Sequence, residues 1–489
     1  MATVMPTRRR RADSFQTESF RIHEDAPSTE DTEMNESALR DDDEVEQDGE
    51  PAEEDGEESR SSESSDEEAT DDSHIQQDME KLQNCFDGFR NKYRLIKRIG
   101  EGTFSTVYKA EDLLYDRYDN SWDLEKEAEK WTPPPLKSFT SQSSTSLDYQ
   151  SQSQRRRKPK YVAIKKIYVT SSPSRIFNEL DLLHDLRGCD SVCPLITAFR
   201  WTDQVVAILP YFRHSDFRDY FRKMTVPDIA IYLRSLFTAL ASVHSHNIIH
   251  RDIKPTNFLY DPTSRRGVLV DFGLAEREGY DTKPCVCHDD PIARKRKLRP
   301  LVSNKAKGGF PREDTRPSRR ANRAGTRGFR APEVLFKCTE QTTKIDIWSA
   351  GVILLTILSR RFPFFNSADD IEAMIEIATI FGRDRMQMAA LLHGCMLETT
   401  IPTIYKSGFS FEGIILWSTD RSGTGQKLSD DEKLAVEFLS RCMELDPSKR
   451  LSAEQALQHD FLRMGMDESV EGASDQGDDD DDEINILKV

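Results

Sequence analysis

Apolar and polar residues alternate on both sides of a glycine-rich turn near residue 100. The stretch that begins at Tyr93 reads YRLIKRIGEGTFSTVYKAEDL, and this alternation flanks Gly100 and Gly102. A two-residue period interrupted by glycines is typical of two strands joined by a turn, so we predict a β-hairpin. The apolar runs at 162–164 and 205–212 predict further strands.

The apolar period then lengthens from two residues to between three and four. Ile176, Leu180 and Leu183 fall on one face of a predicted helix. Residues 226–247 repeat apolar side chains with the same helical spacing, and residues 346–355 are almost continuously apolar. The chain is thus predicted to begin with strands and one helix and to continue with long buried helices. This order indicates an α+β protein.

Both ends of the chain are strongly acidic, which limits where a core can form. Residues 24–80 contain 26 acidic residues against two basic ones, and residues 467–489 contain ten acidic residues and one lysine. Such segments bury too little apolar surface to offset the entropy of ordering. We therefore expect disordered tails over 1–88 and 467–489, with the folded domain over 93–463. Residues 81–466 carry a net charge of +12, so the folded part is basic.

Eight cysteines occur in a chain that shows no secretory signal and no apolar run near 18 residues. This predicts a soluble intracellular protein with free thiols and no membrane association. Basic runs at Arg8–Arg11, Arg155–Lys158 and Arg294–Arg299 are consistent either with nuclear import signals or with solvated loops. The patch SSESSDEE from Ser61 is either a phosphoacceptor region or a solvating charge run.

The stretch from 249 to 275 carries the clearest chemical signature. It contains Asp252, Lys254 and Asn257, and 19 positions after Asp252 it reaches Asp271 of Asp-Phe-Gly. This order and spacing resemble the catalytic loop and metal-binding motif of protein kinases. By that resemblance Asp252 would accept the substrate's hydroxyl proton, Lys254 would offset phosphoryl charge, and Asn257 and Asp271 would hold Mg²⁺. The alternative, ordinary polar loop residues, is disfavoured by the spacing.

The first strands and the helix after them predict an ATP site. Glycines in the turn let the backbone approach phosphates, and Ser105 stands where the kinase pattern has its third glycine. Lys165 would contact the α- and β-phosphates, with Glu179 as its ion-pair partner; a plain helix-surface position is the alternative for Glu179. The predicted ATP-binding residues are Gly100, Gly102, Phe104 at the turn's tip, Ser105, Val107, Ala163, Lys165, Glu179, and Leu209 and Tyr211 beside the adenine.

Two segments of the chain are longer than the corresponding segments of an ordinary kinase. Some 55 residues separate Val107 from Val162, so we expect a mostly disordered insertion of about 116–159 between the second and third strands. A basic insertion rich in glycine and proline, about 277–322, lengthens the segment that follows Asp271.

With Lys254 in the catalytic loop and Thr326 ahead of RGFRAPE, the chain resembles serine/threonine kinases rather than tyrosine kinases. GEGTFSTVY, HRDIKPTNFLY, VDFGLAE, AGTRGFRAPEVL and the long basic insertion closely resemble the cell-division-cycle-seven kinases over about residues 90–465; the first insertion points to a fungal branch. The resemblance implies a bilobal α+β kinase fold, with a five-stranded antiparallel sheet plus one helix in the N-lobe and a mainly helical C-lobe.

The same resemblance implies a function. The family uses ATP and Mg²⁺, is nuclear, requires a regulatory subunit of the dumbbell-former-four type, and phosphorylates the MCM replicative helicase to trigger DNA replication. We expect no sequence-specific contact with nucleic acid.

Two other interpretations of the motifs stay open. A cyclin-dependent or casein-kinase-two-like enzyme shares the fold but is disfavoured by the second insertion and by AGTRGFRAPE. A pseudokinase scaffold is disfavoured because every ATP, metal and base position is filled. Arg450 and Glu333 should form an ion pair that supports the helical lobe.

Four residues near the end of the activation segment predict substrate choice: Arg323, Thr326, Arg327 and Arg330. This segment forms the pocket for the residue after the phosphoacceptor, and arginine binds carboxylate and phosphate through paired hydrogen bonds. We therefore expect a preference for Ser or Thr followed by Asp, Glu or a phosphorylated residue. Alternatively, these arginines bind the acidic tails or a phosphate on the segment.

Cys285, Cys287 and His288 could bind zinc, because thiolate and imidazole are its preferred ligands. A structural site needs four ligands, whereas this motif offers three at cramped spacing, and Cys338 is the nearest later candidate. The alternative is a set of free thiols in a flexible loop.

Overall fold

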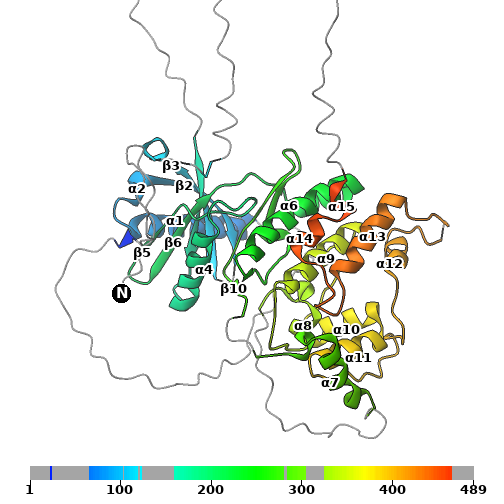
Figure 1. Ribbon diagram of the computed structural model, residues 1–489. Coiled ribbons are helices and arrows are strands. Elements are labelled where there is room, and N and C mark those ends of the chain that lie inside the picture. Colours follow the sequence, from blue (N-terminus) through cyan, green and yellow to red (C-terminus); the bar gives the residue numbers. More distant parts are fainter. Residues whose placement is uncertain are drawn as a thin grey trace, which may run out of the picture. The chain divides into compact units, whose positions relative to one another are not determined.

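The computed structural model describes residues 23–24, 65–102, 104–118, 120, 122–123, 159–279, 283–303, 324–423 and 425–464, with the backbone alone for 23–24, 65–72 and 300–303. Two compact units divide the chain. The first unit contains the residues up to Arg213 together with Val270–Glu276, and the second contains His214–Leu269 and the residues from Arg277 onward. Strands dominate the first unit and helices the second (Figure 1).

Five antiparallel strands form the sheet of the first unit: β2 (Tyr93–Glu101), β3 (Ser105–Asp112), β4 (Tyr161–Ile167), β5 (Thr197–Trp201) and β6 (Gln204–Pro210). They run in the order β5-β6-β4-β3-β2, and β1 (His23–Glu24) adds a short parallel strand beside β5. The register places Lys165 of β4 between Val107 of β3 and Ala207 of β6. The predicted hairpin and the five-stranded antiparallel sheet are confirmed.

One helix, α4 (Pro173–Asp185), provides the predicted helical face of the first unit. It begins at Ser172, whose hydroxyl accepts a hydrogen bond from the backbone N–H of Arg175 and so satisfies one of the helix's free donors. Leu180 and Leu183 are buried, whereas Ile176 is only partly buried. The same turns bury Glu179, which therefore points inward with the apolar residues.

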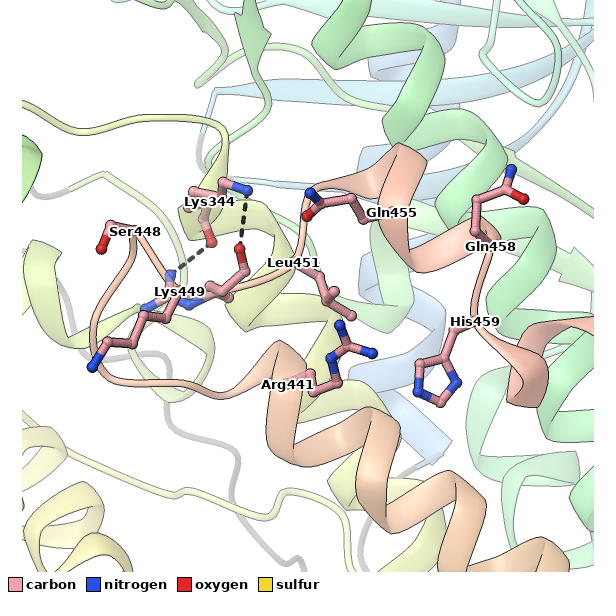
Figure 2. A pocket seen from close by; sticks show the side chains of 9 residues that line it. Lys344, Arg441, Ser448, Lys449, Leu451, Gln455, Gln458 and His459 are labelled. Atoms are coloured by element: carbon pink, nitrogen blue, oxygen red, sulfur yellow. Dashed lines mark hydrogen bonds between the residues drawn. The ribbon is translucent and has the colours of Figure 1, made fainter.

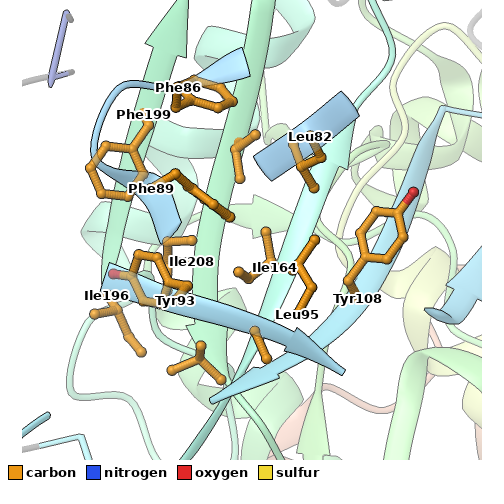
Figure 3. Close-up of a cluster of buried hydrophobic side chains, with 13 residues drawn as sticks. Leu82, Phe86, Phe89, Tyr93, Leu95, Tyr108, Ile164, Ile196, Phe199 and Ile208 are labelled. Atoms are coloured by element: carbon orange, nitrogen blue, oxygen red, sulfur yellow. The ribbon is translucent and has the colours of Figure 1, made fainter. Parts of the chain in front are cut away.

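A helix that the charge pattern did not predict also belongs to the first unit. Helix α1 (Ser65–Cys85) and the short α2 (Phe89–Lys92) precede the sheet. Figure 3 shows Leu82, Phe86 and Phe89 packed with sheet residues such as Ile164, and all four are buried. Leu82 reaches this core from the last turn of α1, Phe86 from the link between the two helices, and Phe89 from the start of α2. The predicted disordered tail of 1–88 is therefore wrong for residues 65–88.

Two long helices organise the second unit. Helix α6 (Val226–Ser245) begins with a capping box in which Thr225 and Asp228 each satisfy the other's backbone N–H. Helix α6 is long and apolar enough to cross a membrane, but its buried side chains make it a core helix. Helix α9 (Lys344–Ser359) is buried from Ile345 to Ser359, as its apolar run predicts.

Shorter elements complete the second unit. They are α5 (Phe217–Tyr220), α7 (Pro291–Ser303), α8 (Pro332–Leu335), α10 (Asp370–Phe381), α11 (Arg383–Leu392), α12 (Phe411–Ser418), α13 (Asp430–Cys442), α14 (Ala453–Leu457), α15 (Asp460–Arg463), β7 (Ile248–Ile249), β8 (Phe258–Asp261) and β9 (Arg266–Leu269). The two-residue β10 (Glu276–Arg277) lies where the chain passes from one unit to the other. This helical unit agrees with the predicted fold class.

The two predicted insertions are only partly described. Residues 124–158 of the first insertion, residues 304–323 of the second, and the acidic tail of 467–489 lie outside the described residues. Within the second insertion, α7 forms a helix and buries Leu298. At least this part of the insertion is ordered structure attached to the second unit.

Candidate active site

A buried lysine in the first unit holds two carboxylates. Lys165 Nζ donates to Glu179 Oε1 and to Asp271 Oδ1, each at 2.7 Å. Burial alone would lower the pKa of Lys165, but the two carboxylates outweigh burial and raise the pKa above its ordinary value. Lys165 therefore stays charged. The predicted pair of Lys165 and Glu179 forms, and the Asp271 side chain keeps 48% of its surface exposed.

The backbone around these three residues explains why they meet. Lys165 sits in a central strand, and Glu179 faces inward from α4. Asp271 adopts a left-handed backbone conformation with φ of 64°, which is uncommon for a residue other than glycine. Such strained residues collect at functional sites, where the surrounding structure holds them in place.

The glycine-rich turn between β2 and β3 is closed by its own backbone. The N–H of Gly102 donates to the carbonyl oxygen of Ser105 at 2.9 Å, and the N–H of Tyr168 donates to that of Phe104 at 2.9 Å. Ser105, the predicted replacement for a third glycine, is the first residue of β3. Ser105 therefore supplies the carbonyl oxygen that closes the turn.

The remaining predicted ATP-site residues lie on neighbouring strands of the same sheet. Ala163 faces Leu209 across the β4–β6 pairing. Lys109 places its ammonium 4.1 Å from the ring centroids of both Tyr161 and Tyr211, which holds the Tyr211 ring at the end of β6. The structure thus brings all ten predicted ATP-site residues into the first unit.

Four residues of the second unit form one hydrogen-bonded network. Asn257 Nδ2 donates to Asp252 Oδ2 at 3.0 Å, and Thr326 Oγ1 donates to Asp252 Oδ1 at 2.7 Å. Lys254 Nζ donates to Thr326 Oγ1 at 2.9 Å and lies 3.3 Å from Asp252 Oδ2. The predicted catalytic residues are thus gathered around one carboxylate, and Thr326 links that carboxylate to the lysine.

A buried carboxylate that sequence reasoning did not single out for this role fixes the loop. Asp346 of α9 accepts hydrogen bonds from the backbone N–H groups of His250 and Arg251, each at 2.8 Å. Its Oδ2 also lies 3.0 Å from His244 Nε2. The loop just before Asp252 is thereby anchored to the central helix. Asp346 lies 96 residues after His250, so the spacing of residues in the sequence did not indicate this anchoring role.

Two of the four predicted substrate-pocket residues line one small hollow. Thr326 and Arg330 line a small hollow with Asp252. Arg330 Nη1 donates to Asp370 Oδ1 at 2.6 Å, and its Nε donates to the carbonyl oxygen of Gly325 at 2.7 Å. Arg327 is half-buried in the same turn, whereas Arg323 lies outside the described residues. Arg330 therefore already has an acidic partner beside the hollow.

Three cysteines and one histidine of the second unit form a buried cluster. The ligand atoms of Cys285, Cys287, Cys338 and His393 all lie within 4.8 Å of one another. The sulfurs of Cys287 and Cys338 are 3.7 Å apart, and Cys285 Sγ is 3.9 Å from His393 Nδ1. A tetrahedral zinc with sulfur ligands has ligand separations of about 3.8 Å, so the donor set and its spacing fit zinc.

The predicted zinc ligand His288 is corrected by this geometry. His288 is exposed and its Nε2 lies 3.1 Å from the carbonyl oxygen of Glu340, outside the cluster. His393, which lies 105 positions later, completes the set instead. Hydrogen bonds among the three thiols lower the pKa of Cys285 and raise the pKa values of Cys287 and Cys338, so the three cysteines titrate as one group. The motif Cys-x-Cys-His suggested the wrong histidine because it considers only sequence neighbours.

The second unit also contains a larger hollow, away from the predicted catalytic residues (Figure 2). Its volume is about 560 Å³, and it is lined by Lys344, Arg441, Ser448, Lys449, Arg450, Leu451, Gln455, Gln458 and His459. Lys344 Nζ donates to the carbonyl oxygen of Arg450 at 3.0 Å, and Arg450 Nη1 donates to that of Lys344 at 2.7 Å. None of the predicted catalytic residues lines this hollow.

Comparisons with known proteins agree with these motifs. The model of the protein kinase domain family matches residues 150–293 and 307–462. The cell cycle serine/threonine-protein kinase hsk1 of Schizosaccharomyces pombe is 49% identical, over 80% of this chain and 76% of its own length. The cell cycle protein kinase spo4 of the same yeast is 41% identical, over 80% and 90%. A probable cell division control protein 7 homolog of Encephalitozoon cuniculi is 39% identical, over 76% and 92%.

Proposed function

The chain belongs to the protein kinase family, in its cell-division-cycle-seven branch, and is an ATP-dependent serine/threonine kinase; on this premise we propose how its residues act, what they act on and what activates them. The observation that carries the proposal is the network of Asp252, Lys254, Asn257 and Thr326. This network holds a carboxylate and an ammonium group next to a segment that can bind a protein substrate.

In the first unit, Lys165 would bind the α- and β-phosphates of ATP while Glu179 keeps its ammonium in place. The Mg²⁺ that accompanies ATP neutralises phosphate charge when bound. Hard divalent cations prefer oxygen ligands, and Asp271 and Asn257 offer a carboxylate and an amide oxygen. Phosphoryl transfer depends on such positioning and charge neutralisation more than on covalent chemistry.

In the second unit, Asp252 would accept the proton of the substrate's serine or threonine hydroxyl. Its Oδ1 accepts from Thr326 and its Oδ2 from Asn257, so the carboxylate is fixed in orientation before a substrate arrives. Lys254 would offset the charge of the phosphoryl group during transfer. Preorganised polar groups of this kind lower the barrier because they need not reorient during the reaction.

The preferred substrate would be Ser or Thr followed by Asp, Glu or a phosphorylated residue. Arg330 supports this specificity because it lines the hollow beside Asp252 and already binds a carboxylate, that of Asp370. A substrate's acidic side chain would engage the remaining donors of the guanidinium or replace Asp370. Charge-assisted, paired hydrogen bonds make arginine selective for carboxylate and phosphate.

The test is a peptide series in which only the residue after the phosphoacceptor varies between Asp, Ala and Lys. The kinase, purified with any subunit that accompanies it, should phosphorylate the Asp peptide fastest. The Arg330→Ala variant should lose this preference, and Asp370→Asn should increase it because Arg330 loses its internal partner. Arg385→Ala, an exposed arginine of α11, is the matched control. Equal wild-type rates for Asp and Lys would end this proposal.

We also propose that this kinase is nuclear and that a regulatory subunit of the dumbbell-former-four type activates it. Its substrate would be the MCM helicase. The support is the resemblance, together with the basic run Arg294–Arg299, in which Lys295, Arg296 and Lys297 are exposed on α7. Measuring the kinase rate of the isolated chain with and without the co-purified subunit tests the activation. An isolated chain that phosphorylates an MCM peptide at the full rate would exclude it.

Cys285, Cys287, Cys338 and His393 would bind one structural zinc ion. Three thiolates and one imidazole would fill all four positions of a tetrahedral zinc, which is typical of structural rather than catalytic sites. Zinc would tie the second insertion to α8 and to the end of α11. Elemental analysis of purified protein should show one zinc per chain, and Cys338→Ser should remove it. Cys189→Ser, a cysteine outside the cluster, should keep it.

A further inference from the structure

Arg175, in the first turn of α4, contacts two segments that are far from it in sequence. The central carbon of its guanidinium lies 3.8 Å from the centroid of the Phe104 ring, at the tip of the glycine-rich turn. Its Nε donates to the carbonyl oxygen of Gly273 at 3.0 Å. All three residues belong to the first unit. One side chain therefore connects the turn, the helix and the Asp-Phe-Gly segment.

Phe104 is held at the tip of the turn by contacts of both its backbone and its ring. The backbone of the tip is tied down on one side by the hydrogen bond from Tyr168 N–H to the Phe104 carbonyl oxygen, at 2.9 Å. Phe104 is 42% exposed, and the Arg175 guanidinium lies over its ring. A planar guanidinium can stack on an aromatic ring while Nε keeps a directed hydrogen bond, which an ammonium group cannot do as well.

The contact with Gly273 lies next to Asp271 and Glu179, the two carboxylates that bind Lys165. A side chain at position 273 would meet Asp271 Oδ1 at 3.3 Å and Glu179 Oε2 at 3.5 Å, so the Gly273 backbone lies close to both carboxylates. Asn178 Nδ2 of α4 donates to the carbonyl oxygen of Ala275 at 2.9 Å. Arg175 and Asn178 thus attach α4 to the Asp-Phe-Gly segment at two points.

We propose that Arg175 is a positioning residue that couples closure of the glycine-rich turn over the phosphates to the placement of Asp271. When Phe104 closes, its ring would hold the guanidinium, and the guanidinium would hold Gly273 and so Asp271. Coupling of this kind is reciprocal, so correct placement of Asp271 would also strengthen ATP binding. The inference rests on the proposed ATP-binding role of the turn.

The test compares Arg175→Met, Arg175→Lys, Phe104→Ala and the double variant Arg175→Met/Phe104→Ala in the full chain with any co-purifying subunit. Arg175→Met should weaken binding of ATP with Mg²⁺, measured by calorimetry, about three- to tenfold, the range for losing one stack and one hydrogen bond. Adenosine, which lacks phosphates, should bind almost as in the wild type. A merely structural loss of α4 would weaken both ligands alike.

The double variant gives the second measurement. If the stack acts as one unit, Phe104→Ala should add little to Arg175→Met, and Arg175→Lys should restore part of the affinity. Arg200→Met is the matched control, because Arg200 also donates from Nε to a backbone carbonyl oxygen, that of Thr202 at 2.9 Å. It should leave both ligands unaffected.

Two outcomes would overturn the inference: additive effects of the two substitutions, or equal losses of ATP and adenosine affinity in Arg175→Met. Failure of the proposed ATP site gives a different result, because Lys165→Met would then retain phosphoryl transfer. If Lys165→Met is inactive while Arg175→Met binds ATP normally, the kinase site stands and only the coupling is wrong.

Discussion

The guanidinium of Arg450 donates hydrogen bonds to both carboxylate oxygens of Glu333, at 2.6 and 3.0 Å. Arg450 is 1% and Glu333 2% exposed, so the pair lies in the interior of the second unit. Arg450 also donates from Nε to the carbonyl oxygen of Glu444 at 3.0 Å. The predicted ion pair is therefore confirmed, and it joins α8 to the segment between α13 and α14.

Removing one partner should destabilise the second unit strongly. Arg450→Met leaves the Glu333 carboxylate buried without its partner, which costs about 3–5 kcal/mol in comparable sites. Because Arg450 lies 5.3 Å from the Trp348 ring, urea unfolding followed by tryptophan fluorescence reports on this region. Arg441→Met, whose partner Glu437 is 3.7 Å away at the surface, should cost no more than about 1 kcal/mol. Equal losses in the two variants would refute this assignment.

The same pair should make stability depend on pH. Burial alone would raise the pKa of Glu333, but Arg450 outweighs burial and holds it below the ordinary value of 4.5. The contribution of the pair is therefore complete above that value and is lost as the pH falls through the lower folded pKa. As the pH falls below about 4.5, the unfolding free energy of the wild type should fall more steeply than that of Glu333→Gln. Parallel curves would count against the depressed pKa.

Lys165→Met should reduce kcat by about a hundred- to a thousandfold, the usual loss when one preorganised charged group is removed. The neighbouring Lys166→Met provides the control, since Lys166 stands next in β4 and takes no part in the pair with Glu179. Circular dichroism should show that both variants are folded. A Lys165→Met enzyme with wild-type kcat would mean that the nucleotide site lies elsewhere.

Thr326 should be required for catalysis through its hydroxyl. Thr326→Val keeps the shape but removes the hydrogen bonds to Asp252 and Lys254, so kcat should fall about ten- to a hundredfold, as for a lost orienting contact. Thr326→Ser keeps the hydroxyl and should recover most of the activity. Similar kcat values for the Val and Ser variants would show that the hydroxyl network is not used.

Chelation should lower thermal stability if the four-residue cluster holds zinc. A structural metal that binds only the folded state stabilises it, so a strong chelator should lower Tm in the wild type. Cys338→Ser should start from a lower Tm and should not respond to the chelator. A wild-type Tm that is unchanged by exhaustive chelation would favour free thiols.

The residues with local sequence signals were predictable, and those defined by distant contacts were not. Lys165, Glu179 and Asp271 follow from motif order, because the chemistry fixes both residue type and spacing. His393 lies 55 positions beyond Cys338 and 108 beyond Cys285, and Asp346 reaches the loop across 95 and 96 residues. Nothing in the local pattern around either residue indicates these partners.

Helix α1 was missed for a different reason. The charge count over residues 24–80 dominated the interpretation, although the apolar residues Leu82, Phe86 and Phe89 follow immediately after it. A few apolar side chains that pack on an existing sheet are enough to order a helix whose other face is acidic. Composition averaged over a long window hides such a short apolar stripe.

The second insertion is fastened at both of its ends to the same unit. Lys283 and Thr339 exchange hydrogen bonds at 2.9 and 3.1 Å, and just after the insertion the N–H of Thr326 donates to Asp252 Oδ1 at 2.9 Å. Closing a longer loop costs only about 0.6 kcal/mol for each doubling of length. Because the described residues on either side of 304–323 have their own contacts within the second unit, Thr326 should stay beside Asp252 when the length of the insertion changes.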